Sequence, residues 1–251
     1  MVFIASYRNE WDKLMTRKKY IVFLIIGLVL CLIWTGLGTL ITGFIRNQGG
    51  FFFNLTPTPM GALPFFLQVV VPFLMFMGVS DLLTVESAEK TMKAVICRPI
   101  ERWKLYASKI LAVVTYAALY LICVFVLTAT LNQILGNALR ISELLVALLS
   151  YVLTLIPLAI LACFAALIAL LGRSGTLTMF LLLMSYILLN ILPILFPVLS
   201  EMLFTSYLSW YNLWIGALPD AAKLIHMLVI VLGYGAVFFI GGSLLFDRKE
   251  Y

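Results

Sequence analysis

The sequence contains few charged residues and a single histidine. Asp, Glu, Lys and Arg together make up 11% of the 251 residues, whereas hydrophobic residues make up 64%. An ordinary soluble domain contains roughly 45–50% apolar residues. The mean hydropathy is +1.12. A water-soluble fold could not cover so much apolar surface with so few charges, so the composition predicts an integral membrane protein.

The residues that build catalytic and metal sites are also scarce. His226 has no Cys, Asp or second His at the spacing of a zinc site or a catalytic triad. Three of the four cysteines lie in apolar runs and Cys97 stands alone in a charged stretch, so we expect free thiols. A phosphate-binding G-x-x-x-x-G-K-[ST] motif is absent. We therefore expect no catalytic residue, no metal and no cofactor on this chain.

Six apolar runs are each long enough to cross a bilayer, for which about 20 residues suffice. They lie at residues 20–45, 61–84, 105–131, 143–171, 175–199 and 224–246. The sequence therefore predicts an all-α integral membrane protein in which residues 1–251 form one transmembrane domain of six helices. Pro64 and Pro72 interrupt the second run, and we expect neighbouring helices to supply donors for the backbone carbonyls that these prolines leave free.

The positive charges predict how the chain is oriented. Of the 17 Lys and Arg residues, five precede the first run, six lie in the central stretch that ends at Lys109 in the first turns of the third run, one lies between the fourth and fifth, and two follow the sixth. Because positively charged loops stay in the cytosol, we expect these segments and both termini to be cytosolic. Topology thus explains the net charge of +6, and we expect no nucleic-acid partner.

Two further segments have amphipathic or aromatic character. Residues 1–19 carry apolar side chains at helical spacing, which predicts a helix in the lipid headgroup layer. Residues 200–223 are too polar to span, and their aromatic content predicts one or two short re-entrant or interfacial helices on the outer face. The residues singled out in the interface helix are Trp11, Lys13 and Arg17.

Residues 86–104 form the most charged segment and lie between the second and third runs. The first half has an apolar stripe at helical spacing, and Glu86 and Glu89 each precede a Lys by four residues, which favours a helix. Pro99 ends this pattern because its ring clashes with the preceding turn. The segment predicts a short cytosolic amphipathic helix, and an ordinary basic loop that happens to coil is the competing interpretation.

This central segment resembles the motif of ABC-2 type permeases, the membrane subunits of a large class of ABC exporters. The matching residues are Glu89-Lys90-Thr91, Arg98-Pro99-Ile100-Glu101-Arg102 and Lys109. Lys90 stands where the family usually has Gly, so we expect a more regular backbone there. Residues 8–19 also resemble the cytosolic interface helix of that family.

The resemblance implies a mechanism in the bacterial plasma membrane. Such permeases pair with a second copy or a related chain, contact membrane lipid, and bind two ATPase subunits that hold ATP–Mg. The loop between the second and third spans forms a coupling helix seated in a cleft of the ATPase. By position, the coupling residues would be Glu86, Glu89, Thr91, Met92, Val95, Arg98, Pro99 and Arg102. The residues of a possible outer gate would be Tyr207, Trp210, Tyr211 and Trp214.

Three functions fit the sequence. The first is the permease subunit of an ABC-2 type exporter, which forms the path of a substrate moved by ATP hydrolysis on a separate subunit. The second is a membrane anchor or sensor that recruits a cytosolic partner without transporting anything. The third is an intramembrane enzyme that uses His226 or Asp81. The mildly polar residues within the spans favour an amphipathic substrate over a bare ion.

Overall fold

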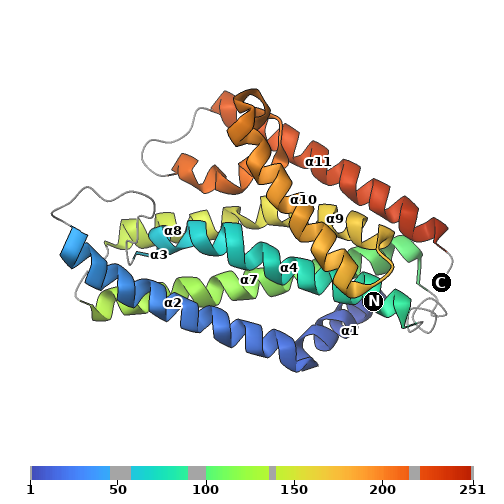
Figure 1. Cartoon of the computed structure of the whole chain (residues 1–251), viewed down its shortest axis with the longest axis horizontal. Helices are drawn as coiled ribbons and strands as arrows, with labels where there is room; N and C mark the ends of the chain where they lie inside the picture. The colour runs from blue at the N-terminus through green and yellow to red at the C-terminus, as the bar shows by residue number, and fades with distance from the viewer. Residues whose placement is uncertain (1, 46–57, 90–99, 136–139, 215–220, 250–251) are drawn as a thin grey trace.

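The computed structural model describes residues 2–45, 58–89, 100–135, 140–214 and 221–249, and the regular elements within them are all helices (Figure 1). Six of these helices are long and apolar enough to cross a membrane. They cover Lys18–Gly38, Pro59–Ala88, Arg102–Ile134, Ile141–Leu171, Gly175–Leu195 and Leu224–Arg248. The prediction of an all-α membrane protein with six spanning helices is therefore confirmed.

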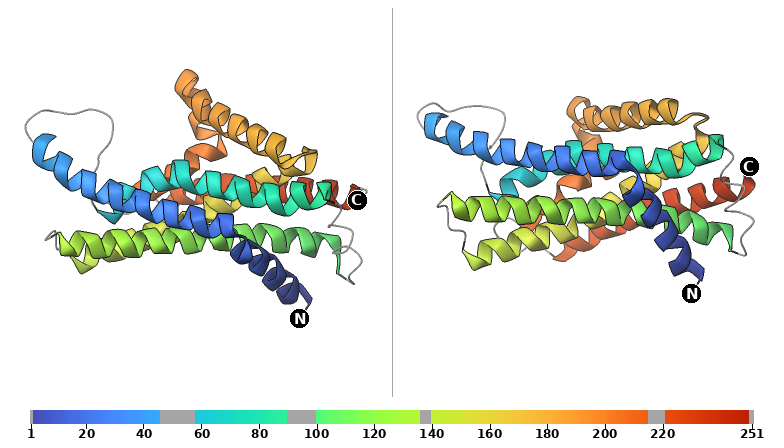
Figure 2. Two further views of the ribbon diagram at one scale, coloured as in Figure 1. Left: turned by 60° about the horizontal axis from the view of Figure 1, so that its bottom comes forward. Right: turned by 90° about the horizontal axis from the view of Figure 1, so that it is seen from below.

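The chain begins with two helices that meet at a bend. Helix α1 (Val2–Thr16) ends one residue before Arg17, and α2 (Lys18–Ile45) follows directly. Figure 2 shows α1 turned sharply away from the direction of α2. The start of α1, the start of α7 and the end of α11 lie at one end of the bundle, whereas the ends of α2 and α7 lie at the other (Figure 1).

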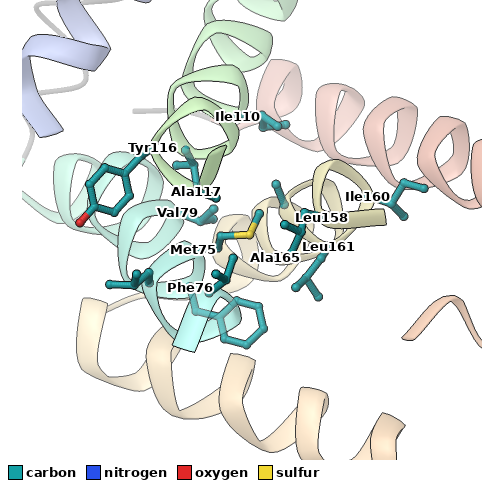
Figure 3. Close-up of a cluster of buried hydrophobic side chains, with 14 of the residues drawn as sticks. Met75, Phe76, Val79, Ile110, Tyr116, Ala117, Leu158, Ile160, Leu161 and Ala165 are labelled. Carbon is teal, nitrogen blue, oxygen red and sulfur yellow. The ribbon is translucent and has the colours of Figure 1, made fainter. Parts of the chain in front are cut away.

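The second span is the most buried of the six, with 61% of its apolar window inside the protein. It consists of α3 (Pro59–Phe65), the π-helix η1 (Phe66–Val70), α4 (Val71–Val79), the π-helix η2 (Ser80–Val85) and α5 (Glu86–Ala88). Its core-facing side chains meet α7 (Arg102–Ile134) and α9 (Leu155–Leu171), and Figure 3 shows Met75 and Val79 beside Ala117 and Leu158. This span therefore forms the centre of the bundle.

Two prolines within the spans leave carbonyls that other segments satisfy. Pro72 has no N–H for the carbonyl of Gln68, and the hydroxyl of Tyr186 donates to that carbonyl over 2.8 Å. Pro193 frees the carbonyl of Leu189 in the same way, and the hydroxyl of Thr205 donates to it over 3.3 Å. The expectation that neighbours supply such donors is confirmed at Pro72.

Helices α7, α9 and α11 (Ala221–Arg248) pack closely. The fourth span is two helices, α8 (Ile141–Leu153) and α9, with a break at Thr154, because Pro157 cannot donate to the carbonyl of Leu153. A Cβ atom on Gly242 of α11 would lie 2.0 Å from the hydroxyl of Tyr106. A side chain at residue 242 would therefore require the buried ring of Tyr106 to move, and Gly242 lets α11 approach α7 closely.

The fifth span differs from its predicted form. Helix α10 (Gly175–Leu195) ends four residues before the expected Leu199, and the 3₁₀ helices η3 (Pro197–Glu201) and η4 (Phe204–Trp214) follow it. Figure 2 shows α10 diverging from the rest of the bundle. The aromatic side chains of η4 were expected at the membrane interface, but Tyr207, Trp210 and Tyr211 are buried inside the protein.

Candidate functional site

Four charged side chains meet where α1, α5 and α7 come together. The Lys109 ammonium lies 2.6 Å from Glu86 Oε2 and 2.9 Å from Glu10 Oε2. The Lys13 ammonium lies 2.9 Å from Glu10 Oε1 and 3.0 Å from Glu86 Oε1. Each carboxylate thus contacts both ammonium groups. We call these four residues the charge cluster.

The charge cluster is almost completely shielded from solvent. Glu10 is 0% exposed, Lys109 is 1% exposed and Glu86 is 4% exposed, whereas Lys13 is half-buried at the rim. Removing single charges from water costs several kcal/mol per ion, so they are stable only when paired and hydrogen-bonded. Two positive and two negative groups give a neutral cluster whose four short contacts meet this condition.

The local sequence explains why α1 turns its polar residues inward. Its buried residues are Ser6, Glu10 and Leu14, which lie on one face at i,i+4 spacing. Ser6 Oγ lies 2.9 Å from Ser108 Oγ on α7, one residue before Lys109. Tyr7 adds a hydrogen bond of 3.1 Å to Thr115 Oγ1. Helix α1 therefore docks on the first turns of α7 through a polar stripe.

The protonation state of Glu10 follows from two opposing effects. Burial acts to raise the pKa of its carboxyl group, but the ammonium groups of Lys109 and Lys13 and their hydrogen bonds outweigh burial. The pKa of Glu10 is consequently lowered from its ordinary value. Glu10 is therefore ionised at neutral pH, as the ion pairs of the cluster require.

A second group of charges surrounds Asp81, five residues before Glu86 on the same span. The hydroxyl of Tyr20 donates to Asp81 Oδ2 over 2.5 Å. Arg17 Nη1 lies 3.4 Å from the same oxygen, and the Lys19 ammonium also contacts it. We call Arg17, Lys19, Tyr20 and Asp81 the Asp81 group. It ties the bend between α1 and α2 to the second span.

The predicted coupling residues divide into three sets. Glu86 was expected to form or brace the contact with the ATPase, and the structure buries its carboxylate against Lys109 and Lys13. Glu89 and Arg102 are exposed, and Arg102 Nη1 donates to the main-chain carbonyl of Asp247 over 2.5 Å. Five others lie outside the residues that the structure describes: Thr91, Met92, Val95, Arg98 and Pro99.

The described part of the predicted helix from Glu86 onward is short. Helix α5 ends at Ala88, and Glu89 adopts φ −78° and ψ 1° in a turn. Of the residues singled out in the interface helix, Lys13 belongs to the charge cluster and Arg17 to the Asp81 group, whereas Trp11 packs half-buried against the core. The side chain of Trp214 lies outside the described residues.

Sequence reasoning missed Glu10, although it contained a usable signal. Lys109 lies inside the predicted span 105–131, and a Lys at such a position needs an acidic partner. Glu86 was the obvious acid, but one carboxylate leaves part of the ammonium group unsatisfied. Glu10 supplies the second carboxylate, and its position on α1 shows that this helix packs on the bundle.

The described residues contain no group of three His, Cys, Asp or Glu side chains that could hold a metal ion. Within the same residues, the partners of Asp81 are Tyr20, Arg17 and Lys19, and His226 is not among them. The charge cluster is suited to a mechanical role, because its ion pairs hold α1, the end of α5 and the start of α7 together at one point.

Comparison with known proteins gives one match that covers most of the chain. Residues 7–190 match the family model described as ABC-2 family transporter protein. The matched range contains all four residues of the charge cluster and both ends of the central charged segment. A comparison with proteins of curated function gave no match.

Proposed function

Since the chain belongs to the ABC-2 family of transporter proteins and has a permease-type role in ABC transport, we propose that it is the permease subunit of an exporter driven by a separate ATPase. ATP–Mg binds to that partner and not to this chain. A second permease subunit completes the path. The protein lies in the cell membrane with both termini in the cytosol, in agreement with the positive charges at the end where α1 begins and α11 ends.

The charge cluster is the observation that supports this proposal most directly. Glu86 lies on α5, the last turn of the second span, and Lys109 lies two turns into α7. These residues flank the segment in which the coupling helix is expected. Glu10 and Lys13 add α1 to the same point. A displacement of the central segment would therefore move the second span, the third span and α1 together.

The proposed coupling residues are those that remain available to a partner. Glu89 and Arg102 are exposed on the two sides of the central segment. Met92 and Val95 would supply the apolar contact, and Arg98 the charge that fixes the register. Glu86 has a different role in this scheme, because it anchors the coupling segment to the bundle from inside.

The second span also has a structure that suits a moving element. Its two π-helical segments, η1 and η2, interrupt the regular hydrogen-bond pattern on either side of α4. Such segments recur at functional sites, since a small change in pairing shifts one half of a helix against the other. We propose that movement of the coupling segment tilts this span and opens the path. The buried aromatic side chains of η4 would then form the outer gate.

Co-purification tests the proposal. The chain and its ATPase are expressed together, and Met92→Asp and Arg98→Glu are each expected to abolish their association, since each replaces an anchoring group with a negative charge. Arg140→Glu is the matched control, because Arg140 is exposed at the N-cap of α8, away from the charge cluster. Normal ATPase binding and turnover in both variants would refute the coupling assignment. Uptake into proteoliposomes with the ATPase present then separates a permease from an anchor.

A further inference from the structure

An apolar cavity of about 410 Å³ opens between α2, the second span and α10. This volume lies within the range of about 300–1,000 Å³ that is usual for small-molecule sites. Its walls are formed by residues such as Phe23 and Leu30 of α2, Phe73 of α4, and Leu183 and Ile187 of α10. The hydroxyl of Tyr186, which also lines the cavity, donates to the main-chain carbonyl of Gln68. The cavity therefore suits a hydrocarbon chain.

A second, more polar cavity of about 330 Å³ lies between the second span and α10, closer to the end of the bundle that carries Asp81 and its cations. Asp81 and Met77 of the second span line it, together with Thr176 and Met179 of α10. On the second span, Phe73, Met77 and Asp81 follow one another at i,i+4 and so share a face. The two cavities therefore follow one another along this face of the second span, and we call them together the groove.

Helix α2 lines the apolar section and begins at the same charged end, next to the polar section. Lys19, Phe23 and Leu30 lie on one face of α2 by their spacing of four and seven residues. Lys19 and Arg17 both contact Asp81, which lines the polar section. Two cations and one carboxylate give this section an excess positive charge, whereas the other section is apolar. The groove is amphipathic along its length.

The distance along α2 from the cation of Lys19 to Leu30 in the apolar section matches one leaflet of a bilayer. Lys19 and Leu30 are 11 residues apart on α2, which corresponds to about 16 Å at 1.5 Å per residue. Half of a hydrocarbon core of about 30 Å is about 15 Å. We propose that the groove binds one anionic phospholipid of the leaflet at the end where α1 lies. The phosphate contacts Arg17 and Lys19, and an acyl chain runs past Phe73 and Leu183.

The charge of the ligand follows from the polar section of the groove, and its lipid character follows from the apolar section. A groove that opens sideways in the bilayer is filled by hydrocarbon, because no water is present there to fill it. A zwitterionic lipid would gain little from the excess positive charge, whereas basic residues at this depth attract anionic lipids. This inference does not depend on the proposed function, because lipid binding requires no ATPase.

Native mass spectrometry of the purified chain tests the proposal. The protein is titrated with phosphatidylglycerol or with phosphatidylcholine that carries the same acyl chains. We expect one tightly bound phosphatidylglycerol per chain, and the double variant Arg17→Gln/Lys19→Gln should reduce its affinity roughly tenfold or more without changing that of phosphatidylcholine. Arg8→Gln/Lys18→Gln is the matched control, because it also removes two positive charges, from exposed residues of the same N-terminal segment outside the Asp81 group.

A second pair of variants tests the apolar section. Ile187→Trp should fill the groove and abolish the tightly bound lipid, whereas Leu188→Trp, at an exposed neighbour that does not line the groove, should retain it. Equal binding of the two lipids, or undiminished binding in Ile187→Trp, would overturn the proposal. Disulfide formation between Ile187→Cys residues of two chains would also overturn it, because a second copy would then occupy the groove.

Discussion

The charge cluster and the Asp81 group lie five residues apart on the second span, but their environments differ. Glu86 is 4% exposed and belongs to a neutral set in which each carboxylate contacts two ammonium groups. Asp81 faces a cavity and is outnumbered by the cations of Arg17 and Lys19, whose side chains are partly exposed. A closed, neutral set can hold helices together, whereas an open set with excess charge can attract a ligand.

The difference arises from the faces of the span that carry the two acids. Helix α1 and the first turns of α7 cover the face that carries Glu86, and they bring Glu10 and Lys109 to it. The start of α2 contacts Asp81, and a cavity remains between Asp81 on the second span and the start of α10. On the second span, Glu86 thus contributes to stability, and Asp81, five residues earlier, lies where a ligand would be attracted.

Loss of Lys109 is expected to have the largest effect. Lys109→Met leaves Glu10 and Glu86 buried with only the half-exposed Lys13 as a partner, and removing one member of a buried ion pair costs about 3–5 kcal/mol. We expect a large loss of monodisperse protein on heating in detergent. Lys104→Met is the control, because Lys104 pairs with Glu101 at the surface.

The charge balance of the cluster gives an internal check of this prediction. In Glu86→Gln/Lys109→Gln, the remaining charges are those of Glu10 and Lys13, which form a pair. The double variant should therefore be more stable than Lys109→Gln alone. If the two are equally unstable, the effect of Lys109 comes from packing and not from charge.

Acidification should destabilise the charge cluster less than the loss of Lys109 does. The pKa of Glu10 is lower in the folded protein than its unfolded value of about 4.3. Its contribution to stability is therefore complete above this value and is lost as the pH falls through the folded pKa. Thermal denaturation of the wild type should vary little with Glu10 ionisation between pH 6 and 8 and fall below about pH 4.3. In Glu10→Gln, the part of the stability loss that comes from protonation of Glu10 should be absent. An acid profile identical to that of the wild type would contradict the role given to the Glu10 carboxylate.

The spans could be predicted from the sequence, because an apolar run of about 20 residues has few alternatives to crossing a bilayer. The relation of α1 to the bundle could not. Its apolar residues predicted a helix in the headgroup layer, but Ser6, Glu10 and Leu14 face inward because Ser108 and Lys109 lie opposite them. Such a choice of face depends on residues about 100 positions away, which local periodicity does not contain.

The same limit applies to Glu86 and to the aromatic residues of η4. Glu86 has a Lys at i+4, and this spacing alone predicts an exposed helical pair. The inward direction of its carboxylate results from Lys109, 23 residues later. Tyr207, Trp210 and Tyr211 fit a membrane interface by composition, but they become buried because the 3₁₀ helix η4 folds back onto neighbouring spans.

Neutralisation of Asp81 is expected to have the smallest effect on stability and the clearest effect on the groove. In Asp81→Asn the hydroxyl of Tyr20 can still donate to the side-chain oxygen, and the lost partners Arg17 and Lys19 are partly exposed, so the cost should be about 1 kcal/mol or less. The same change removes the only negative charge of the Asp81 group. Phosphatidylglycerol binding should therefore tighten by roughly threefold to fivefold in native mass spectrometry.

Glu86→Gln should show the reverse pattern, with a large loss of stability and unchanged lipid preference. Weaker phosphatidylglycerol binding in Asp81→Asn would mean that the carboxylate positions the two cations and does not compete with the lipid for them.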